Sequence, residues 1–370
     1  MALDNYYTLG KSGLRVSRLA LGAMTFGSEW GWGAEKDGAK ALFNHYVDAG
    51  GNFIDTADLY TNGTSESWLG EFVKERNLRD KIVIATKFSY NAEPGNPNAG
   101  GNGRKNILRA VEGSLKRMGT DYIDLYFLHT WDTLTRPEEV MRTMDDLVRD
   151  GKVRHIGLSD VPAWYASRAQ TIADWRGYEP VSALQMEYSL TERNIENEYI
   201  DMGQELGMGV MVWSPLASGL LSGKYKPSES KVEGEGRLAS LAASGNPAFA
   251  KFTDKNWKVV SALEKVASEI NQPMATVAIN WVANRPGVSS VILGATKLSQ
   301  LEQTTSSLDF EIPEVLMTEL NEASQPDLQF PYTFFTPGMQ SMLAGSTKVG
   351  DKPGSYKKTN FIDAAPAGVE

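Results

Sequence analysis

The chain has 370 residues, of which 41% are hydrophobic, and a formal net charge of −9. This length permits a large core, and the acidic balance argues against general binding to nucleic acid or to an anionic membrane surface. The absence of cysteine excludes disulfides, thiolate zinc sites and cysteine nucleophiles. Only His45, His129 and His155 could supply imidazole ligands, and we predict no metal site.

The first ten residues, MALDNYYTLG, lack the basic and apolar regions of a signal peptide. No apolar run reaches the roughly 18 residues that a membrane helix needs. These two features predict a cytoplasmic protein with no membrane partner.

In chain order, YYTLGKSGLRVSRLALG predicts a short hairpin that leads into a first strand, because Gly10 and Gly13 bracket a turn. Apolar runs of strand length then alternate with amphipathic stretches of helical period. The further expected strands are 52–55, 81–87, 121–129, 153–158, 181–186, 208–213 and 289–293. The expected helices are 35–49, 65–77 (capped by Thr64 or Ser65), 104–118, 137 to about 151, 162–174, 194–206, roughly 255–285 and 298–308.

Eight strand–helix units with β-branched or leucine-rich strands indicate parallel strands joined by helical crossovers. This pattern predicts an α/β fold, a (β/α)8 TIM barrel with an N-terminal hairpin. A doubly wound sheet is the alternative. If it bound a dinucleotide, it would normally carry G-x-G-x-x-G after its first strand, and the chain has no such motif. The glycines of 99–106 have the wrong spacing and predict a loop.

Two segments interrupt the alternation. Residues 222–256, after the seventh strand, are polar and rich in Gly, Ser and Glu, and long loops of this kind are usually functional or disordered. Residues 326–370 contain the aromatic run FPYTFF (330–335), which could fold over the barrel mouth. We therefore expect a barrel domain over 1–325 and a partly ordered C-terminal extension over 326–370.

Polar residues follow the apolar strands at the end where a TIM barrel places its active site. Asp55 ends the second strand, Lys87 the third and His129 the fourth, and Tyr60 stands in the loop after Asp55. Each has an ordinary explanation when taken alone, such as a rim lysine or a helix-capping aspartate. Together they predict a buried lysine paired with Asp55, and a cation beside a phenol lowers the tyrosine pKa from its usual value of about 10. This arrangement suits a phenolic general acid.

The segments GNFIDTADLY, KIVIATK, SLKRMGTDYIDLYFLH, GKVRHIGLSD and WSPLASGLLSGKY resemble those of the aldo-keto reductases, from about residue 5 to 325. The resemblance is to long-loop bacterial-type members, in the Tas-like and channel-beta-subunit-like branches. It implies a TIM barrel that binds NADPH in an extended form without a Rossmann fold and reduces carbonyls. The resemblance implies that Tyr60 donates the proton, that Asp55 and Lys87 adjust the pKa of its hydroxyl, and that His129 orients the carbonyl.

The same resemblance implies a set of cofactor-binding residues. Ser159 and Gln185 would hold the nicotinamide carboxamide, with Asp160 beside them, and Trp213 would stack on the ring. The loop after the seventh strand would bind the pyrophosphate, and the segment GATKLSQLEQT would bind the adenosine phosphate. The residues assigned to these two parts are Ser214, Leu216, Ser218, Gly219, Leu220 and Lys224, and then Gly294, Thr296, Lys297 and Gln300.

Some positions depart from the family pattern. Asp160 stands where the family usually has Asn, and a carboxylate cannot donate a hydrogen bond to the carboxamide. Gln303 and Thr304 replace a frequent Glu-Asn pair. Lys297 favours NADPH, although NADH is possible. Arg237 could clamp the phosphates, and the loop at 222–256 could then close as a lid over the cofactor.

Trp30, Trp32 and Trp131 follow the first and fourth strands and suggest a bulky or aromatic small-molecule carbonyl substrate. The leading hypothesis is an NADPH-dependent enzyme that reduces an aldehyde or ketone. The alternatives are a cofactor-binding regulatory or scaffold subunit and an enzyme that works as an alcohol dehydrogenase. The sequence leaves the oligomeric state open.

Overall fold

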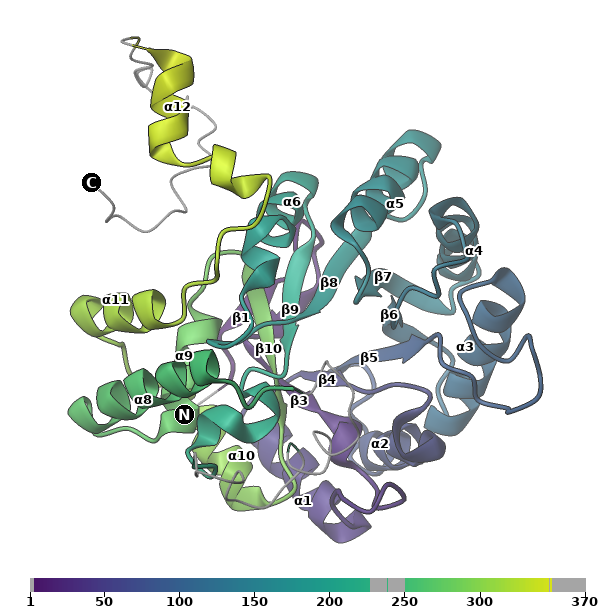
Figure 1. The fold of residues 1–370 in the computed structure, drawn as a ribbon. Coiled ribbons are helices and arrows are strands. Elements are labelled where there is room, and N and C mark those ends of the chain that lie inside the picture. Colours follow the sequence, from purple (N-terminus) through teal and green to yellow (C-terminus); the bar gives the residue numbers. More distant parts are fainter. Residues whose placement is uncertain (1–2, 227–237, 239–249, 346, 348–370) are drawn as a thin grey trace.

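In the computed structural model, which describes residues 3–226, 238, 250–345 and 347, eight parallel strands close into a barrel (Figure 1). The strand order around the barrel is β10-β3-β4-β5-β6-β7-β8-β9, which confirms the predicted TIM barrel. The barrel strands are β3 (Leu19–Gly22), β4 (Phe53–Asp55), β5 (Val83–Phe88), β6 (Ile123–Leu128), β7 (Val153–Ser159), β8 (Val181–Glu187), β9 (Gly209–Trp213) and β10 (Val288–Gly294).

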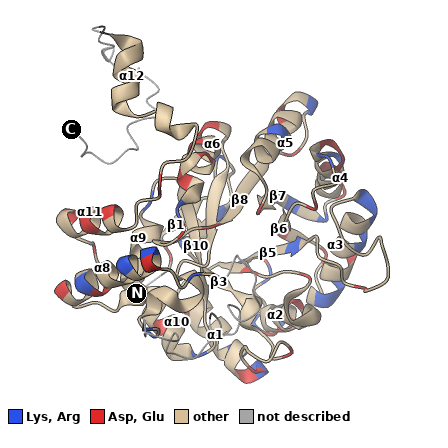
Figure 2. Ribbon diagram, in the orientation of Figure 1, with Lys and Arg blue, Asp and Glu red and all other residues tan. Residues whose placement is uncertain are grey.

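Helices surround the barrel, and Figure 2 shows charged residues on outer helices such as α4, α8 and α11. Within the described residues no helix combines the length and hydropathy needed to cross a membrane. The α-helices are α1 (Lys36–Asp48), α2 (Thr64–Glu75), α3 (Arg104–Met118), α4 (Pro137–Arg149), α5 (Ala163–Arg176), α6 (Tyr199–Leu206), α8 (Asp254–Glu269), α9 (Met274–Ala283), α10 (Leu298–Thr305), α11 (Glu314–Ala323) and α12 (Pro337–Ala344).

The predicted hairpin is β1 (Tyr6–Thr8) and β2 (Arg15–Ser17), which pair antiparallel. Leu9 and Val16 from this hairpin are fully buried in one cluster with the inward-facing barrel residues, among them Phe127 and Met211. The hairpin therefore closes one end of the barrel. The other end, where residues follow the carboxyl ends of the strands, is therefore the place for an active site.

Several boundaries differ from the prediction. The helix expected over 194–206 is split into the short 3-10 helix η3 (Asn194–Asn197) and α6, whereas α8 and α9 are the helices expected over roughly 255–285. Neither Thr64 nor Ser65 caps α2, whose N-cap is Gly63. The Ser65 hydroxyl instead donates to the carbonyl of Ala23 at 2.7 Å, which ties α2 to the segment after β3.

The described part of the C-terminal extension does not cover the barrel. Neither the 3-10 helix η7 (Tyr332–Phe334) nor α12 contains a buried residue, and Phe330 is 82% exposed. In Figure 1, α12 extends away from the barrel beyond α6. The expectation that FPYTFF folds over the mouth is therefore wrong for this structure, because the chain after α11 leads outward.

Two buried acidic residues, Asp58 and Glu66, stand on either side of Tyr60 in the chain. Asp58 is 7% exposed, and its Oδ1 has no hydrogen-bond partner among the described residues. Glu66, which is fully buried, accepts hydrogen bonds from Thr86 Oγ1 and Arg117 Nε, each at 2.6 Å. Burial, together with the charge of Glu66, raises the pKa of Asp58 to about 7. The folded protein therefore holds a proton on Asp58 at pH values where the unfolded chain has released it.

A first prediction concerns barrel packing. A Cβ added at Gly157 would lie 2.2 Å from Cε1 of Phe127, whose ring is fully buried inside the barrel. We expect Gly157→Ala to lower the free energy of unfolding by about 1–3 kcal/mol, because the interior ring has no free space to move into. Urea denaturation measures this change. Gly294→Ala, at a strand end with no atom within 4 Å of the added Cβ, is the control and should change stability by less than about 0.5 kcal/mol.

A second prediction concerns pH. Because the folded-state pKa of Asp58 lies above its unfolded value, its burial costs stability progressively as pH rises from about 4 to about 7. Asp58→Asn does not titrate, so the variant should gain stability relative to the parent as pH rises, on the order of 1–3 kcal/mol by about pH 8. Thermal melts at about pH 5 and pH 8 test this. An identical difference at both values would show that Asp58 does not hold the proton.

Candidate active site

Lys87 lies at the centre of the site, near the C-terminal end of β5, with no solvent exposure. Its Nζ donates to Asp55 Oδ2 at 2.7 Å and to the carbonyl of Thr56 at 2.8 Å, and it lies 3.3 Å from the hydroxyl of Tyr60. Asp55 comes from the neighbouring strand β4. The predicted lysine, carboxylate and phenol therefore meet in one hydrogen-bonded cluster.

The electrostatics of this cluster favour a charged lysine. Burial acts to lower the pKa of Lys87, but the negative charge of Asp55 and the Tyr60 hydroxyl outweigh it, and the net pKa is raised. The second carboxylate oxygen of Asp55 accepts from Gln185 Nε2 at 2.8 Å. Both Asp55 oxygens are thus fixed by donors, so the ion pair has a single arrangement.

His129 follows β6 and completes the predicted group of four. Its ring lies edge to face with Tyr60, with centroids 5.8 Å apart, and with Tyr90, at 5.0 Å. Burial, and then the charge of Lys87, holds the pKa of His129 well below its usual value. The Nδ1 atom is buried without a hydrogen-bond partner among the described residues. A neutral imidazole in this position can donate one hydrogen bond to a substrate oxygen.

The loop after Asp55 places the phenol by an unusual backbone path. Thr61 and Asn62 have φ values of 47° and 55°, in the left-handed region that non-glycine residues seldom adopt. The Thr61 hydroxyl holds this path by donating to the carbonyl of Phe26 at 2.6 Å. Trp30 lies edge to face with Tyr60 at 6.3 Å and beside Trp32 at 5.6 Å. Two of the three predicted substrate tryptophans therefore lie on the Tyr60 side of the site.

The residues assigned to the nicotinamide end lie at the carboxyl ends of β7, β8 and β9. The Ser159 hydroxyl is buried and has no partner among the described residues. Trp213 Nε1 donates to Asp160 Oδ1 at 3.1 Å, and Asp160 has a φ of 46°. The Asp160 side chain is exposed to solvent, and partial desolvation by the surrounding protein raises its pKa to about 6. Gln185, by contrast, donates to Asp55, a contact that the sequence did not predict.

The loop after β9 has the conformation of an anion-binding turn. Ser214, Ala217, Ser218 and Gly219 all have positive φ values, between 48° and 98°. The Ser218 amide donates to Ser214 Oγ at 3.0 Å, which stabilises the tight path. Turns that combine right- and left-handed residues point successive N–H groups into a concavity suited to phosphate.

The side chains around this loop differ in whether they can contact a bound phosphate. Leu220 is fully buried, so its contribution to a ligand is limited to its backbone, and Leu216 packs against the core. The Lys224 ammonium lies 5.0 Å from the Tyr225 ring centroid, and its side chain runs beside Gly219. Arg237 and most of the proposed lid (222–256) lie outside the described residues.

The predicted adenosine segment forms the end of β10 and the start of α10. Gly294 pairs with Gly22 of β3, and Thr296 follows it. Gln300 Oε1 accepts from the amides of Thr296 at 2.9 Å and Lys297 at 3.2 Å, which caps α10. The Lys297 side chain is exposed at this helix N-terminus. A cation and a helix N-terminus together suit an anionic group.

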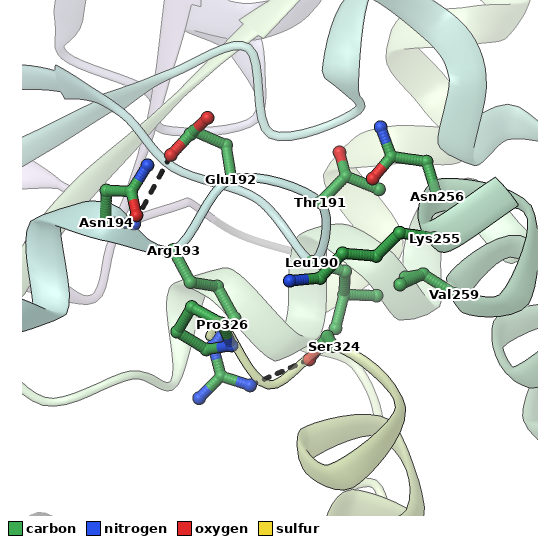
Figure 3. Close-up of a pocket in the computed structure, with 10 residues that line it drawn as sticks. All are labelled: Leu190, Thr191, Glu192, Arg193, Asn194, Lys255, Asn256, Val259, Ser324 and Pro326. Carbon is green, nitrogen blue, oxygen red and sulfur yellow. Dashed lines mark hydrogen bonds between the residues drawn. The ribbon is translucent and has the colours of Figure 1, made fainter. Parts of the chain in front are cut away.

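Two cavities lie near the carboxyl ends of the strands. One, of about 580 Å³, is lined by Trp131 and Trp213 together with Asp160, Val161, Pro162, Met186, Glu187, Glu192, Asn194, Ile195 and Tyr199. Trp131, the third predicted substrate residue, also packs edge to face on Trp164, with centroids 5.4 Å apart. The other cavity, of about 110 Å³, is lined from the loop after β8, from α8 and from the end of α11 (Figure 3). There Arg193 donates to Ser324 Oγ at 2.8 Å, and none of the predicted site residues lines the cavity.

Sequence reasoning missed one aromatic residue of the site. Tyr90 stands three residues beyond Lys87, and its ring covers His129 at 5.0 Å. Burial and the charge of Asp160 raise the pKa of Tyr90, so its hydroxyl stays protonated at neutral pH. Its position after a strand end was the signal available in the sequence.

Comparisons with known proteins agree with this geometry. A model described as the aldo/keto reductase family matches residues 18–325. An aryl-alcohol dehydrogenase of Pestalotiopsis microspora is 33% identical over 90% of this chain and 84% of its own length. A probable voltage-gated potassium channel subunit beta of Oryza sativa subsp. japonica is 36% identical over 82% of this chain and 91% of its own length. An aryl-alcohol dehydrogenase [NADP(+)] of Phanerodontia chrysosporium is 34% identical over 88% and 87%.

The match covers most of the chain, including all eight barrel strands and the strand ends where the cluster lies. The predicted resemblance is thereby confirmed. The chain belongs to the aldo/keto reductase family and is an NAD(P)H-dependent oxidoreductase.

Proposed function

We propose that the protein reduces an aldehyde or ketone to an alcohol with NADPH, and that Tyr60 is the general acid. The observation that carries this proposal is the contact of the fully buried Lys87 ammonium with Asp55 at 2.7 Å and with the Tyr60 hydroxyl at 3.3 Å. A buried cation 3.3 Å from a phenol stabilises the phenolate that remains after proton transfer. An acid with this support can protonate a carbonyl oxygen at neutral pH.

The roles of the four residues follow from their positions. Tyr60 donates its proton to the carbonyl oxygen as that oxygen becomes an alkoxide, and Lys87 then stabilises the phenolate. Asp55 keeps Lys87 charged and in place. His129, neutral because of its lowered pKa, donates a hydrogen bond to the same oxygen without adding a competing charge. The bound nicotinamide cofactor supplies the hydride.

The residues present fit such a cofactor in three places. Ser159 offers a buried hydroxyl with no hydrogen-bond partner among the residues that the structure describes, which suits a carboxamide. The turn with positive φ values after β9 offers backbone N–H groups beside Lys224, which suits a pyrophosphate. Lys297 at the start of α10 suits a 2′-phosphate, and this favours NADPH over NADH.

The remaining assignments stay part of this proposal. We assign catalysis to a barrel domain over 1–325, treat 326–370 as an extension, and place the protein in the cytoplasm. The substrate is a bulky or aromatic carbonyl compound, held by Trp30, Trp32 and Trp131. Aryl-alcohol dehydrogenases among the relatives support an aromatic substrate, and they keep alcohol oxidation open as the physiological direction.

A regulatory subunit is the second candidate, because the rice relative is named as a channel beta subunit. The buried lysine cluster does not distinguish the two functions, since a scaffold can retain it. Turnover of 4-nitrobenzaldehyde with NADPH separates them. A protein that binds NADPH tightly but does not oxidise it with any aldehyde would favour the subunit.

The first test of the proposal is Tyr60→Phe, which removes the phenolic hydroxyl and keeps the ring. We expect kcat to fall at least ~10²-fold while NADPH affinity stays within about twofold, because the hydroxyl acts on the substrate oxygen. Stopped-flow turnover and fluorescence titration measure the two quantities. Near-normal kcat in this variant would remove Tyr60 from the mechanism.

Cofactor choice provides a second test. We expect Lys297→Met to weaken NADPH binding by about 1–3 kcal/mol and to leave NADH nearly unchanged, because the lost partner faces only the 2′-phosphate. Calorimetric titration with both cofactors measures the difference. Lys258→Met, at an exposed lysine of α8, is the matched control and should change neither affinity. Equal weakening of both cofactors would place the 2′-phosphate elsewhere.

A further inference from the structure

The larger cavity has an apolar surface with an acidic edge. Its aromatic and aliphatic lining comes from Trp131, Trp213, Tyr199, Val161, Pro162, Met186 and Ile195. Three carboxylates also line it: Asp160 after β7, Glu187 at the end of β8 and Glu192 in the loop beyond. None of the lining residues within the described part of the chain is Lys, Arg or His. A ligand here meets aromatic faces together with negative charge.

The negative charge is only partly balanced. Lys251, 9% exposed, lies 2.9 Å from Glu187 Oε1 and 3.8 Å from Glu192 Oε2, so one ammonium serves two carboxylates. Asp160 accepts from Trp213 Nε1, a neutral donor. Among the residues that the structure describes, three carboxylates and one ammonium leave a net negative charge at the cavity wall. An anionic group placed there would lose hydration and gain no cation, which is unfavourable.

This cavity adjoins the catalytic cluster. Gln185, which donates to Asp55 of the cluster at 2.8 Å, directly precedes Met186 and Glu187 of the cavity wall on β8. Trp131 stands two residues after His129 and lines the cavity. A substrate with its carbonyl at Tyr60 and His129 can therefore direct its distal end into the cavity.

We propose that this cavity selects substrates by charge: it takes aromatic carbonyl compounds whose distal end carries a neutral hydrogen-bond donor such as a hydroxyl, and it excludes those that end in a carboxylate. Glu192 is the main specificity residue, because Glu187 is held more closely by Lys251. Trp131 and Tyr199 hold the substrate ring, which leaves Trp213 to the nicotinamide, and the carboxylate oxygens of Glu192 and Glu187 accept from the donor. This inference rests on the proposed reductase activity.

The first experiment compares three para-substituted benzaldehydes at about pH 7.5. They are 4-(hydroxymethyl)benzaldehyde, 4-(methoxymethyl)benzaldehyde, which lacks the donor, and 4-formylbenzoate, which is anionic. We expect kcat/KM for 4-formylbenzoate to be at least about tenfold below that for the hydroxymethyl compound, with the methoxymethyl compound between them. Because these substituents have small electronic effects on the carbonyl, the order reports binding at the distal end.

The second experiment assigns the effect to the cavity. Glu192→Gln should raise kcat/KM for 4-formylbenzoate about fivefold and change that for 4-(hydroxymethyl)benzaldehyde less than about twofold, because a neutral amide still accepts from a hydroxyl. Glu205→Gln removes the same charge from an exposed position on α6 and is the control, with no change expected. Glu187 is left intact so that Lys251 keeps its closest partner.

The outcomes separate this inference from the proposed function. If all three aldehydes are reduced with equal kcat/KM, or if Glu192→Gln and Glu205→Gln have the same effect, the charge selection is wrong and the reductase activity stands. If no aldehyde is reduced although NADPH binds, the proposed function itself fails. A preference for 4-formylbenzoate in the parent protein would also overturn the inference.

Discussion

The burial of one ammonium group determines the arrangement of this site. Lys87 is fully enclosed, and an enclosed charge is tolerated only with partners of opposite charge or strong acceptors. Asp55 and the Thr56 carbonyl provide them at 2.7 and 2.8 Å. The Asp58 amide continues the pairing past the end of β4 by donating to the Lys87 carbonyl at 3.1 Å. The chain is thus held against β5 up to Tyr60, and the phenol arrives beside the same ammonium.

The strand ends of this group could be predicted from sequence, and the cross-barrel contacts could not. Asp55, Lys87 and His129 follow apolar runs of strand length, so parallel pairing alone brings them to one edge. Gln185 is 130 residues from Asp55 in the chain, and only barrel closure sets the distance between their side chains. Its donation to Asp55 is therefore a property of the closed barrel. The same holds for Trp213 and Asp160, whose bond joins β9 to the loop after β7.

Irregular backbone conformation also could not be predicted from the sequence. Positive φ values occur at Thr61, Asn62, Ser214 and Ser218, although none of these residues is glycine, which adopts this region most readily. Local propensity predicts the opposite conformation at each position. Tertiary contacts override it, as in the bond from Thr61 Oγ1 to the Phe26 carbonyl. Non-glycine residues held in this region concentrate at functional sites, and here they lie after β4 and β9, at the edges of the proposed catalytic and phosphate sites.

Cationic and acidic side chains follow neighbouring strands at the carboxyl end of the barrel. Lys224 and Lys297, with the amides near them, lie after β9 and β10, whereas Glu187 ends β8 and Glu192 lies in the loop beyond it. In the proposed cofactor assignment, the phosphates of NADPH belong to the first region and the distal end of the substrate to the second. An anionic substrate placed at the cationic region would compete with the cofactor, and the acidic cavity offers it no alternative. A neutral ring with a donor fits the cavity without contesting the phosphate contacts, so one barrel mouth can hold a highly anionic cofactor and an uncharged substrate together.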